Sequence, residues 1–404
     1  MKKVLTVILV LMMVLSAFAC TKTEAPVTNE TPATEGKTEP QTEPEAPAEL
    51  PKVNFWTTGS QNVCDVFTSV IQAYNAKADR KCNVELQFIL SGSGDETLYS
   101  RLAAAYKTGQ TNSGFDMIAE NGGAFQSYVD EAGSEDVLLD IDTSKLSNYD
   151  LVQLEPVVLK NKLVPYRGTT VVFAYNSDKL PDPPKTWEEL VTWIKANDGR
   201  FAYNTPDSGG AGAAFVRTAI YRFIEDQSAR MSNDEKWAGY WDEGYNWLAD
   251  IHPYLYKSGG HVQYPTKNQG ALDVLISEEI WMTPAWADQV MTQKEAGTMS
   301  ENIKMYQLSD GALAGSDVDI AITSIGSNVD ACYDFINFVI SPEGQQILVD
   351  QMKAVPVIDS TLLEQTASVA AVGALNPSEF AFLSIGSLGD AINNRWTEDI
   401  ATLG

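Results

Sequence analysis

Hydrophobic and polar positions alternate along the chain in a rhythm that predicts strands followed by helices. Residues 53–57 and 84–90 are rich in apolar and β-branched side chains and predict two strands. Between them, apolar residues at helical spacing predict a helix over 62–78; they are Val63, Val66, Phe67, Val70, Ile71 and Tyr74. Residues 116–120 predict a third short strand. This alternation is typical of a mostly parallel sheet with helices on both faces.

Each predicted strand ends in a polar or glycine-rich turn, at 56–60, 91–94 and 120–123. Ligands of α/β sheets bind at the carboxyl ends of the strands, so we expect these turns to converge on one crevice. Beyond the second turn, Ser93 and Glu96 form a capping-box pattern that predicts the start of the next helix.

The first fifty residues follow a different pattern. After the positively charged start, residues 4–15 are nearly all apolar, a length that suits a signal peptide and falls short of the roughly 20 residues of a membrane-spanning helix. Ala17 and Ala19 precede Cys20, which fits a lipoprotein signal over 1–19, cleaved before Cys20 and followed by lipidation of that cysteine. Ala17 stands where Leu is more usual, and secretory cleavage after Ala19 without lipidation is the alternative. Either process places the mature protein outside the cytoplasm.

The segment that follows Cys20 is predicted to be a tether. It is rich in Thr, Glu and Pro and holds no aromatic residue up to residue 50. Such a composition cannot bury a core, so the segment should stay extended. Residues 20–50 are therefore predicted to be a lipidated cysteine and a linker that holds the folded part off the membrane.

Composition limits the partners and the chemistry. The chain has 404 residues, of which 44% are hydrophobic, enough for one large or two ordinary lobes. It carries 28 Lys and Arg against 54 Asp and Glu, a formal net charge of −26, which disfavours nucleic acid as a partner. Only two His and four Cys are present, and no metal-binding or phosphate-loop motif stands out. We therefore expect neither a metal nor a cofactor.

The middle of the chain carries a resemblance to a known family. The run Tyr175 to Leu190, with its Leu-Pro turn and Pro-Lys-Thr-Trp-Glu-Glu-Leu segment, resembles the interlobe segment of extracellular solute-binding proteins of ABC importers. Residues 333–349, with Ser-Pro-Glu-Gly-Gln, resemble the late helix pair of that family. Residues 197–203 and 209–215 most resemble its thiamine-, iron- and polyamine-binding branch. Together the resemblance spans most of 52–360.

The resemblance implies a fold and a division of the chain. The fold would be α/β and periplasmic-binding-protein-like, with two doubly wound lobes joined by a hinge. Residues 52–164 and 316–352 would form the first lobe and 165–304 and 353–404 the second, and 305–315 would cross between them. Contacts of a ligand with both lobes would favour a closed state.

The function implied by the resemblance is binding, not catalysis. A lipid-anchored subunit, expected to be a monomer, would capture a small polar or cationic organic solute and deliver it to ABC permease subunits in the membrane. Two alternatives stay open at this point. One is a secreted hydrolase that uses paired carboxylates such as Asp116 and Glu120. The other is a surface ligand sensor or adhesin on the same fold, because fold alone does not determine function.

Candidate ligand contacts of the first lobe lie at its strand ends. Trp56 could stack on a ligand or fill the flank of the sheet, and Thr58 and Ser60 could bind a ligand or cap the helix. Glu120 and Asn121 follow the third strand, where Glu120 could pair with a cationic ligand or lie at the surface. These residues form the first part of the predicted site.

Further candidates lie near the crossover and in the second lobe. Tyr166 and Arg167 precede the crossover strand, where hinge residues often face the ligand, and Tyr166 is the predicted contact of the two. Free N–H groups at the helix start that holds Ser208, Gly210 and Ala211 could bind an anion or a carbonyl group, or form only a turn and cap. The family resemblance also implicates the turn that ends at Asp288. There Trp286 would offer an aromatic face, and Asp288 a carboxylate, to an organic cation.

Overall fold

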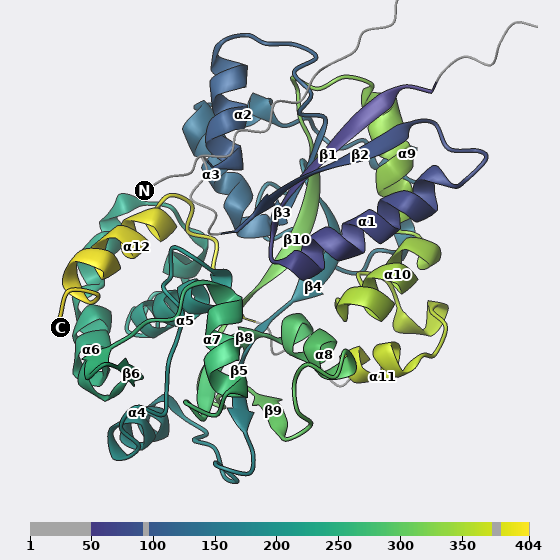
Figure 1. The fold of residues 1–404 in the computed structure, drawn as a ribbon. Helices are drawn as coiled ribbons and strands as arrows, with labels where there is room; N and C mark the ends of the chain where they lie inside the picture. The colour runs from purple at the N-terminus through teal and green to yellow at the C-terminus, as the bar shows by residue number, and fades with distance from the viewer. Residues whose placement is uncertain (1–49, 92–96, 374–380, 404) are drawn as a thin grey trace, which may run out of the picture. The chain divides into compact units, whose positions relative to one another are not determined.

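The computed structural model describes residues 50–91, 97–373 and 381–403 (Figure 1). The predicted signal peptide, Cys20, most of the linker and the Ser93–Glu96 capping box lie outside these ranges. Among the helices of the described ranges, none is both long enough and apolar enough to cross a membrane.

The first sheet begins with the three predicted strands. Strands β1 (Lys52–Gly59), β2 (Asn83–Leu90) and β3 (Met117–Asn121) run parallel, with β1 in the middle. Strand β10 (Ala314–Ile322) joins β3 antiparallel, and it also pairs with β4 (Val164–Thr169) and β11 (Ala381–Phe382). The sheet is therefore mixed, because the chain returns to it from the opposite direction after building the second sheet.

Helices cover both faces of this sheet, as the sequence pattern predicts. One face packs against α1 (Gln61–Asn75), α9 (Val329–Val339) and α10 (Pro342–Met352), and the other against α2 (Leu98–Lys107) and α3 (Phe125–Ala132) (Figure 1). Alternation along β1 explains the two cores: Val53 and Phe55 point to the α1 face, and Trp56 packs on the α2 face. The burial of a side chain such as Phe55, which is fully buried, contributes about 1.5–3 kcal/mol to the free energy of unfolding.

The second sheet is smaller and antiparallel. Its strand order is β8-β5-β9, with bounds β5 (Val171–Asn176), β8 (Met282–Trp286) and β9 (Ile303–Tyr306). The remaining helices are α4 (Trp187–Ala196), α5 (Gly210–Tyr221), α6 (Asp242–Ile251), α7 (Lys267–Ile276), α8 (Ala287–Glu295), α11 (Ala367–Gly373) and α12 (Leu388–Asp399), and a short hairpin joins β6 (Lys257–Ser258) to β7 (His261–Val262). Two α/β lobes result, and the fold class predicted from the sequence is confirmed.

The chain passes between the sheets in extended conformation. Strand β4 of the first sheet continues through Thr170 into β5 of the second. The return runs from the end of β9 at Tyr306 to the start of β10 at Ala314. Val355 adds a backbone bridge to Gly168 of β4. These extended segments connect the two lobes.

The segment after α10 packs against both lobes in turn. Val355, Val357 and Leu363 belong to the core formed by α1, α9 and α10. Farther on, Ile392 and Trp396 of α12 belong to the core of the second lobe. The sequence assigned all of 353–404 to the second lobe, whereas the start of this segment is tied to β4 and packs with the first. The lobe boundaries themselves stay a prediction.

Candidate ligand-binding site

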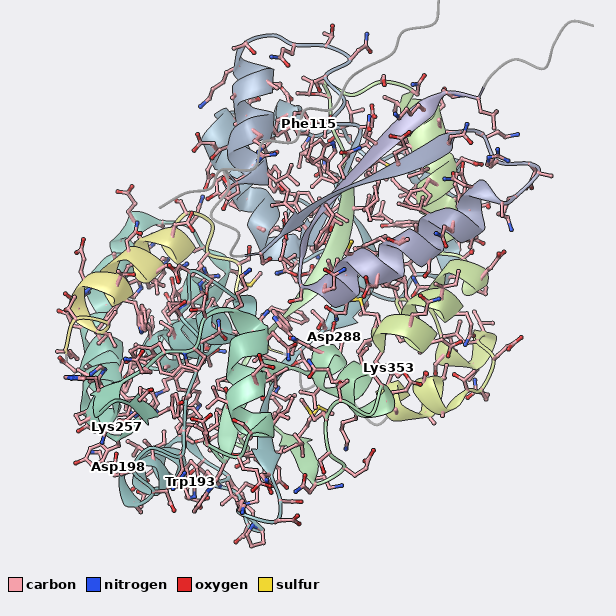
Figure 2. All side chains as sticks on the ribbon, viewed as in Figure 1. Phe115, Trp193, Asp198, Lys257, Asp288 and Lys353 are labelled. Atoms are coloured by element: carbon pink, nitrogen blue, oxygen red, sulfur yellow. The ribbon has the colours of Figure 1, made fainter. Side chains whose placement is uncertain are left out.

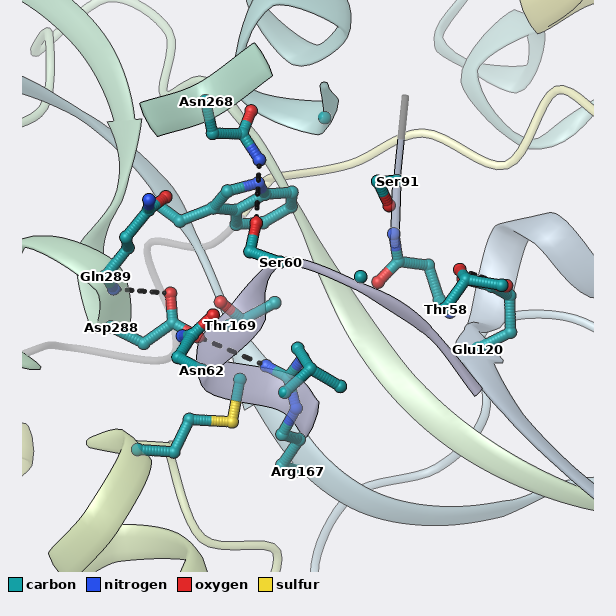
Figure 3. A pocket seen from close by; sticks show the side chains of 16 residues that line it. Thr58, Ser60, Asn62, Ser91, Glu120, Arg167, Thr169, Asn268, Asp288 and Gln289 are labelled. Carbon is teal, nitrogen blue, oxygen red and sulfur yellow. Dashed lines mark hydrogen bonds and ion pairs between the residues drawn. The ribbon is translucent and has the colours of Figure 1, made fainter. Parts of the chain in front are cut away.

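A cavity of about 90 Å³ lies where the predicted strand-end turns meet the second sheet (Figure 3). We call it the inner cavity. Its lining residues are Thr58, Gly59, Ser60, Asn62, Val63, Ser91, Glu120, Asn121, Arg167, Thr169, Gly210, Asn268, Trp286, Asp288, Gln289 and Met352. The turns after β1, β2 and β3 all contribute, so the predicted convergence of these turns is confirmed.

On the first-lobe side, Glu120 is held by Thr58. The Thr58 hydroxyl donates a hydrogen bond of 2.7 Å to Oε2 of Glu120 (Figure 3). Burial raises the pKa of Glu120 above its ordinary value, against the hydrogen bonds from Thr58 and the Asn121 N–H and against the charge of Arg167, which lower it. The carboxyl group is thus oriented at the cavity and would gain from a donor or a cation on a ligand.

Arg167 and Asp288 form an ion pair across the cavity. Arg167 belongs to β4 of the first sheet, and Asp288 to the first turn of α8, which follows β8 of the second. Nη1 of Arg167 lies 3.6 Å from Oδ2 of Asp288, and each side chain is 7% exposed. That spacing leaves Nη1 of Arg167 without a hydrogen-bond partner among the described residues. The pair therefore joins the two lobes and keeps donor capacity for a ligand.

Burial and the neighbouring groups of Asp288 shift the pKa of its carboxyl group in opposite directions. Burial raises the pKa of Asp288, while the charge of Arg167 and the backbone N–H of Gln289 lower it. The Gln289 N–H donates to Oδ1 of Asp288 at 2.9 Å (Figure 3). Figure 2 shows Asp288 between the elements of the two lobes, far from the surface pair Asp198 and Lys257.

Asn268 makes a second contact between the walls. Its Nδ2 donates to Oγ of Ser60 at 3.3 Å, and its Oδ1 accepts the N–H of Ala211 at 3.0 Å. Helix α5 starts after Gly209, which has no side chain to cap the free N–H groups. Asn268 of α7 supplies the missing acceptor and so ties the start of α5 to the first lobe.

Trp286 forms an aromatic wall beside the start of α5. The indole lies so close to Gly210 that a Cβ on this glycine would come within 2.8 Å of Cζ2 of Trp286. A second cavity of about 200 Å³ shares Trp286, Gly210 and Asn121 with the inner cavity. We call it the Arg217 cavity, because Arg217 of α5 lines it. The two cavities therefore adjoin at one tryptophan.

Seven of the eleven predicted ligand contacts line the inner cavity: Thr58, Ser60, Glu120, Asn121, Gly210, Trp286 and Asp288. Their role in binding a ligand stays a prediction. They share a position at a strand end or at a helix start, where backbone direction alone brings side chains to the crevice.

The other four predicted contacts lie elsewhere. Nε1 of Trp56 donates to the carbonyl of Gly114 at 2.8 Å, so this ring fills the flank of the sheet. Tyr166 is 1% exposed and belongs to the first-lobe core. Ser208 accepts the N–H of Lys267 at 2.8 Å, and Ala211 is fully buried. None of the four lines the inner cavity.

The predicted site lacked several lining residues, Asn268 foremost, and of the neighbours Tyr166 and Arg167 it contained Tyr166, whereas Arg167 lines the cavity. Arg167 follows Tyr166 on β4 at an irregularity in the pairing with β10, and Nε of Arg167 donates to the Tyr166 hydroxyl at 3.4 Å. The sequence does not show which of the two faces the core. Gly209 has no side chain that could accept hydrogen bonds from the free N–H groups at the start of α5. The sequence could therefore have suggested that a residue from another segment, such as Asn268, caps this helix.

The paired carboxylates of the hydrolase alternative are not brought together at the cavity. Asp116 accepts hydrogen bonds from the N–H groups of Asn54 at 2.8 Å and Ser327 at 2.6 Å, and it does not line the inner cavity, whereas Glu120 does. Asp116 thus has a structural role. Within the described ranges, no group of three or more His, Cys, Asp or Glu side chains could hold a metal ion.

A family model described as bacterial extracellular solute-binding protein matches residues 69–375. Among curated proteins, YnjB of Escherichia coli is 24% identical over 189 residues, which cover 45% of this chain and 46% of that protein. The thiamine-binding periplasmic protein of Haemophilus influenzae is 26% identical over 220 residues, which cover 54% and 57%. The chain thus matches about half the length of these curated relatives.

Solved structures share the fold. A periplasmic thiamin binding protein superimposes with a TM-score of 0.63 at 16% identity over 88% of this chain and 98% of that chain. AfuA of Actinobacillus pleuropneumoniae, with fructose-6-phosphate bound, superimposes with a TM-score of 0.60 at 17% identity over 87% of this chain and 99% of that chain. The Atu4243–GABA receptor superimposes with a TM-score of 0.61 at 15% identity over 86% of this chain and 96% of that chain. At these identities the likeness shows the fold alone.

Proposed function

The chain belongs to the family of bacterial extracellular solute-binding proteins, and we propose that it captures a small polar or cationic organic solute in the inner cavity and delivers it to an ABC permease. One observation carries the proposal: side chains from both sheets line a single cavity, and the Arg167–Asp288 pair spans it. A solute that touches both walls stabilises the closed arrangement, and a permease distinguishes closed from open.

The lining supports an amphipathic, partly cationic solute. Trp286 offers a flat apolar face, and the carboxylates of Glu120 and Asp288 outnumber the one guanidinium, of Arg167, in the lining. A cation over an aromatic ring with a carboxylate nearby gains both cation–π and charge interactions. The remaining polar lining residues, among them Ser60, Asn62 and Asn268, suit hydrogen-bonding groups of the solute.

The relatives suggest which solutes to test. Their names and bound molecules include thiamine, GABA and fructose-6-phosphate. We choose a panel of matched pairs in which one member carries an added or substituted anionic group: thiamine and thiamine monophosphate, putrescine and GABA, fructose and fructose-6-phosphate. Such pairs change the charge of one end of the solute and little else.

A thermal-shift screen of the purified protein against this panel tests the proposed function. A solute at about 100 times its Kd adds about 2.7 kcal/mol to the free energy of unfolding, which gives a clear rise in Tm. The expected result is a rise with members of one chemical class. A well-folded protein whose Tm none of these solutes raises would contradict capture of a solute of this kind.

We also propose that the protein is held at the outer face of the cell membrane by lipid on Cys20. The support is the small-residue pattern before Cys20 and membership of an extracellular family. The expected result for Cys20→Ala is release from the membrane fraction, since a single diacyl anchor would be lost. An unchanged membrane fraction, together with an unmodified Cys20 by mass spectrometry of the wild type, would contradict the anchor.

A further inference from the structure

Helix α5 presents one stripe of small residues to the Arg217 cavity. Gly210, Ala213, Ala214 and Arg217 all line this cavity, and their spacing places them on one face of the helix. Trp286 lines this cavity as well as the inner cavity, and Arg217 lines it from the same face of α5 as Gly210. A solute that occupied both cavities would therefore reach this arginine.

The guanidinium of Arg217 has no partner within the part of the chain that the structure describes. Its Nε is buried and makes no hydrogen bond, and no carboxylate lies within the 4.0 Å of an ion pair. Asp390 also lines the cavity, yet its Oδ2 accepts a hydrogen bond of 3.1 Å from Tyr99, and its charge acts on Arg217 only from farther away. Burial lowers the pKa of Arg217, as expected for a cation without a close counter-charge.

Two other arginines of the second lobe have contacts that Arg217 lacks, although Nε of Arg222 and Nε of Arg230 are likewise buried without a hydrogen-bond partner among the described residues. Arg222, at the end of the same helix, lies over the rings of Trp187, Phe223 and Trp247. Arg395 makes ion pairs with Asp242 at 2.7 Å and Asp399 at 2.9 Å. Arg217 is partly buried and lacks such contacts within the described ranges, so a counter-charge on a ligand can pair with its guanidinium.

The position of the guanidinium is closely constrained. A Cβ on Gly389, near the start of α12, would come within 2.8 Å of Nη2 of Arg217, so this glycine makes room for the side chain. Helix α12 packs beside α5, and the N-terminal ends of both helices face the cavity through Gly389 and Gly210 (Figure 1). Helix N-termini add positive potential to that of the arginine. A planar fork in such a position suits a carboxylate or a phosphate.

We propose that Arg217 binds an anionic group, a carboxylate or a phosphate ester, at one end of the solute whose other end occupies the inner cavity. The inference rests on the proposed function and narrows its ligand. The charges of the two cavities are complementary to such a solute: two carboxylates and one guanidinium line the inner cavity, and Arg217 with the already hydrogen-bonded Asp390 lines its neighbour. Solutes with one cationic or hydroxyl-rich end and one anionic end are the class selected.

Calorimetric titration of the wild type and of Arg217→Gln with the matched pairs tests this inference. In at least one pair, the anionic member should bind the wild type at least tenfold more tightly than its partner. Arg217→Gln should abolish that preference and leave the affinity for the uncharged or cationic member within about twofold. Arg217→Lys, which keeps the charge without the fork, should retain part of the preference.

The matched control for Arg217→Gln is Arg395→Gln. Arg395→Gln removes the same charge from an ion-paired surface arginine and should leave every affinity unchanged. Solutes that bind the wild type with no preference for the anionic member, or with a preference that survives in a folded Arg217→Gln protein, would overturn the inference and leave the proposed function standing. No binding of any panel member would contradict the proposed function and the inference with it.

Discussion

The inner cavity and the Arg217 cavity meet at Trp286 but satisfy their charges in different ways. In the inner cavity each carboxylate has a partner of its own, Thr58 for Glu120 and Arg167 for Asp288. In the Arg217 cavity the guanidinium has none among the described residues. The first cavity is thus organised before a solute arrives, whereas the second holds a guanidinium without an ion-pair partner in the described part of the chain, which an anionic group of a solute could pair with.

This difference separates two ways of using a buried charge. A charge paired within the protein positions neighbouring groups and contributes to the connection of the lobes. An unpaired charge lowers the stability of the free protein and returns that free energy when a counter-charge binds. Substitutions at the two cavities should therefore change stability in opposite directions.

The largest effect is expected when the ion pair of the inner cavity is broken. Asp288→Ala removes the ion-pair partner of the buried Arg167 and should lower the free energy of unfolding by about 3 kcal/mol. Urea denaturation of the ligand-free wild type and variant measures this difference in the free energy of unfolding. The control is Asp198→Ala, which breaks a pair of similar kind at the surface, with 2.6 Å between Lys257 and Asp198, and should change stability by less than about 1 kcal/mol. Equal losses in the two variants would show that the Arg167–Asp288 pair contributes little.

The second prediction concerns a buried carboxyl group that lines neither cavity. Asp319 of β10 is fully buried, and its side chain hydrogen-bonds the neighbouring carboxyl group of Asp317. Burial, and next the neighbouring Asp317, raise the pKa of Asp319 well above its ordinary value. The folded protein therefore holds a proton there that the unfolded chain releases, and stability falls as pH rises above the unfolded pKa of about 4.

Asp319→Asn keeps the shape of this side chain and removes its titration. At pH 7 the variant should be more stable than the wild type by about 1–2 kcal/mol, and the gain should shrink toward pH 4. Urea denaturation at several pH values measures the difference. A gain that is constant with pH, or a loss at pH 7, would show that Asp319 is not protonated by burial in the folded state.

The third prediction concerns Arg217 in the absence of any solute. Arg217→Gln removes a partly buried charge without an ion-pair partner among the described residues and should raise the free energy of unfolding of the free protein by less than about 1 kcal/mol. The same variant is expected to lose its preference for anionic solutes, so stability and binding should change in opposite directions. Denaturation of ligand-free protein measures the first change. A loss of more than about 1 kcal/mol would indicate that Arg217 has a structural role instead.

The smallest effect is expected at the hydrogen bond between Thr58 and Glu120. Thr58→Val removes the hydroxyl that lowers the pKa of Glu120, so this pKa should rise further. Affinity for a cationic member of the panel should then fall at a higher pH than in the wild type as the solution is acidified. At neutral pH the binding free energy of this cationic solute should weaken by about 1 kcal/mol. Calorimetric titrations across pH 5–7 measure the shift, and identical pH profiles would contradict a role for the Glu120 charge.

The sequence predicted the fold better than it predicted the walls of the cavities. Strands β1 to β3 and helix α1 have strong period-2 and period-3.6 patterns, and local patterns suffice to place them. Thr58 and Glu120 could be proposed because they lie at the ends of predicted strands, and direction along a parallel sheet brings such residues to one edge. Asp288 could be proposed because of the family resemblance.

Contacts between distant segments could not be predicted in the same way. Arg167 lines the cavity and Tyr166 the core, and only the pairing of β4 with β10 decides between them. The stripe that ends at Arg217 has the pattern of an ordinary small-residue helix face, and a cavity exists there only because α12 returns beside α5. The same long-range packing sets the position of Val355 and its neighbours.

The most direct test of solute capture between the lobes is the dissociation constant of the tightest-binding panel solute for Trp286→Ala. Trp286 is the one aromatic side chain that lines both cavities, and Trp193→Ala is the control, because Trp193 lies on α4, away from Asp288 (Figure 2). We expect at least a tenfold weaker affinity, about 1.4 kcal/mol, for Trp286→Ala and no change for Trp193→Ala. An unchanged dissociation constant for a folded Trp286→Ala protein would contradict binding in this cleft.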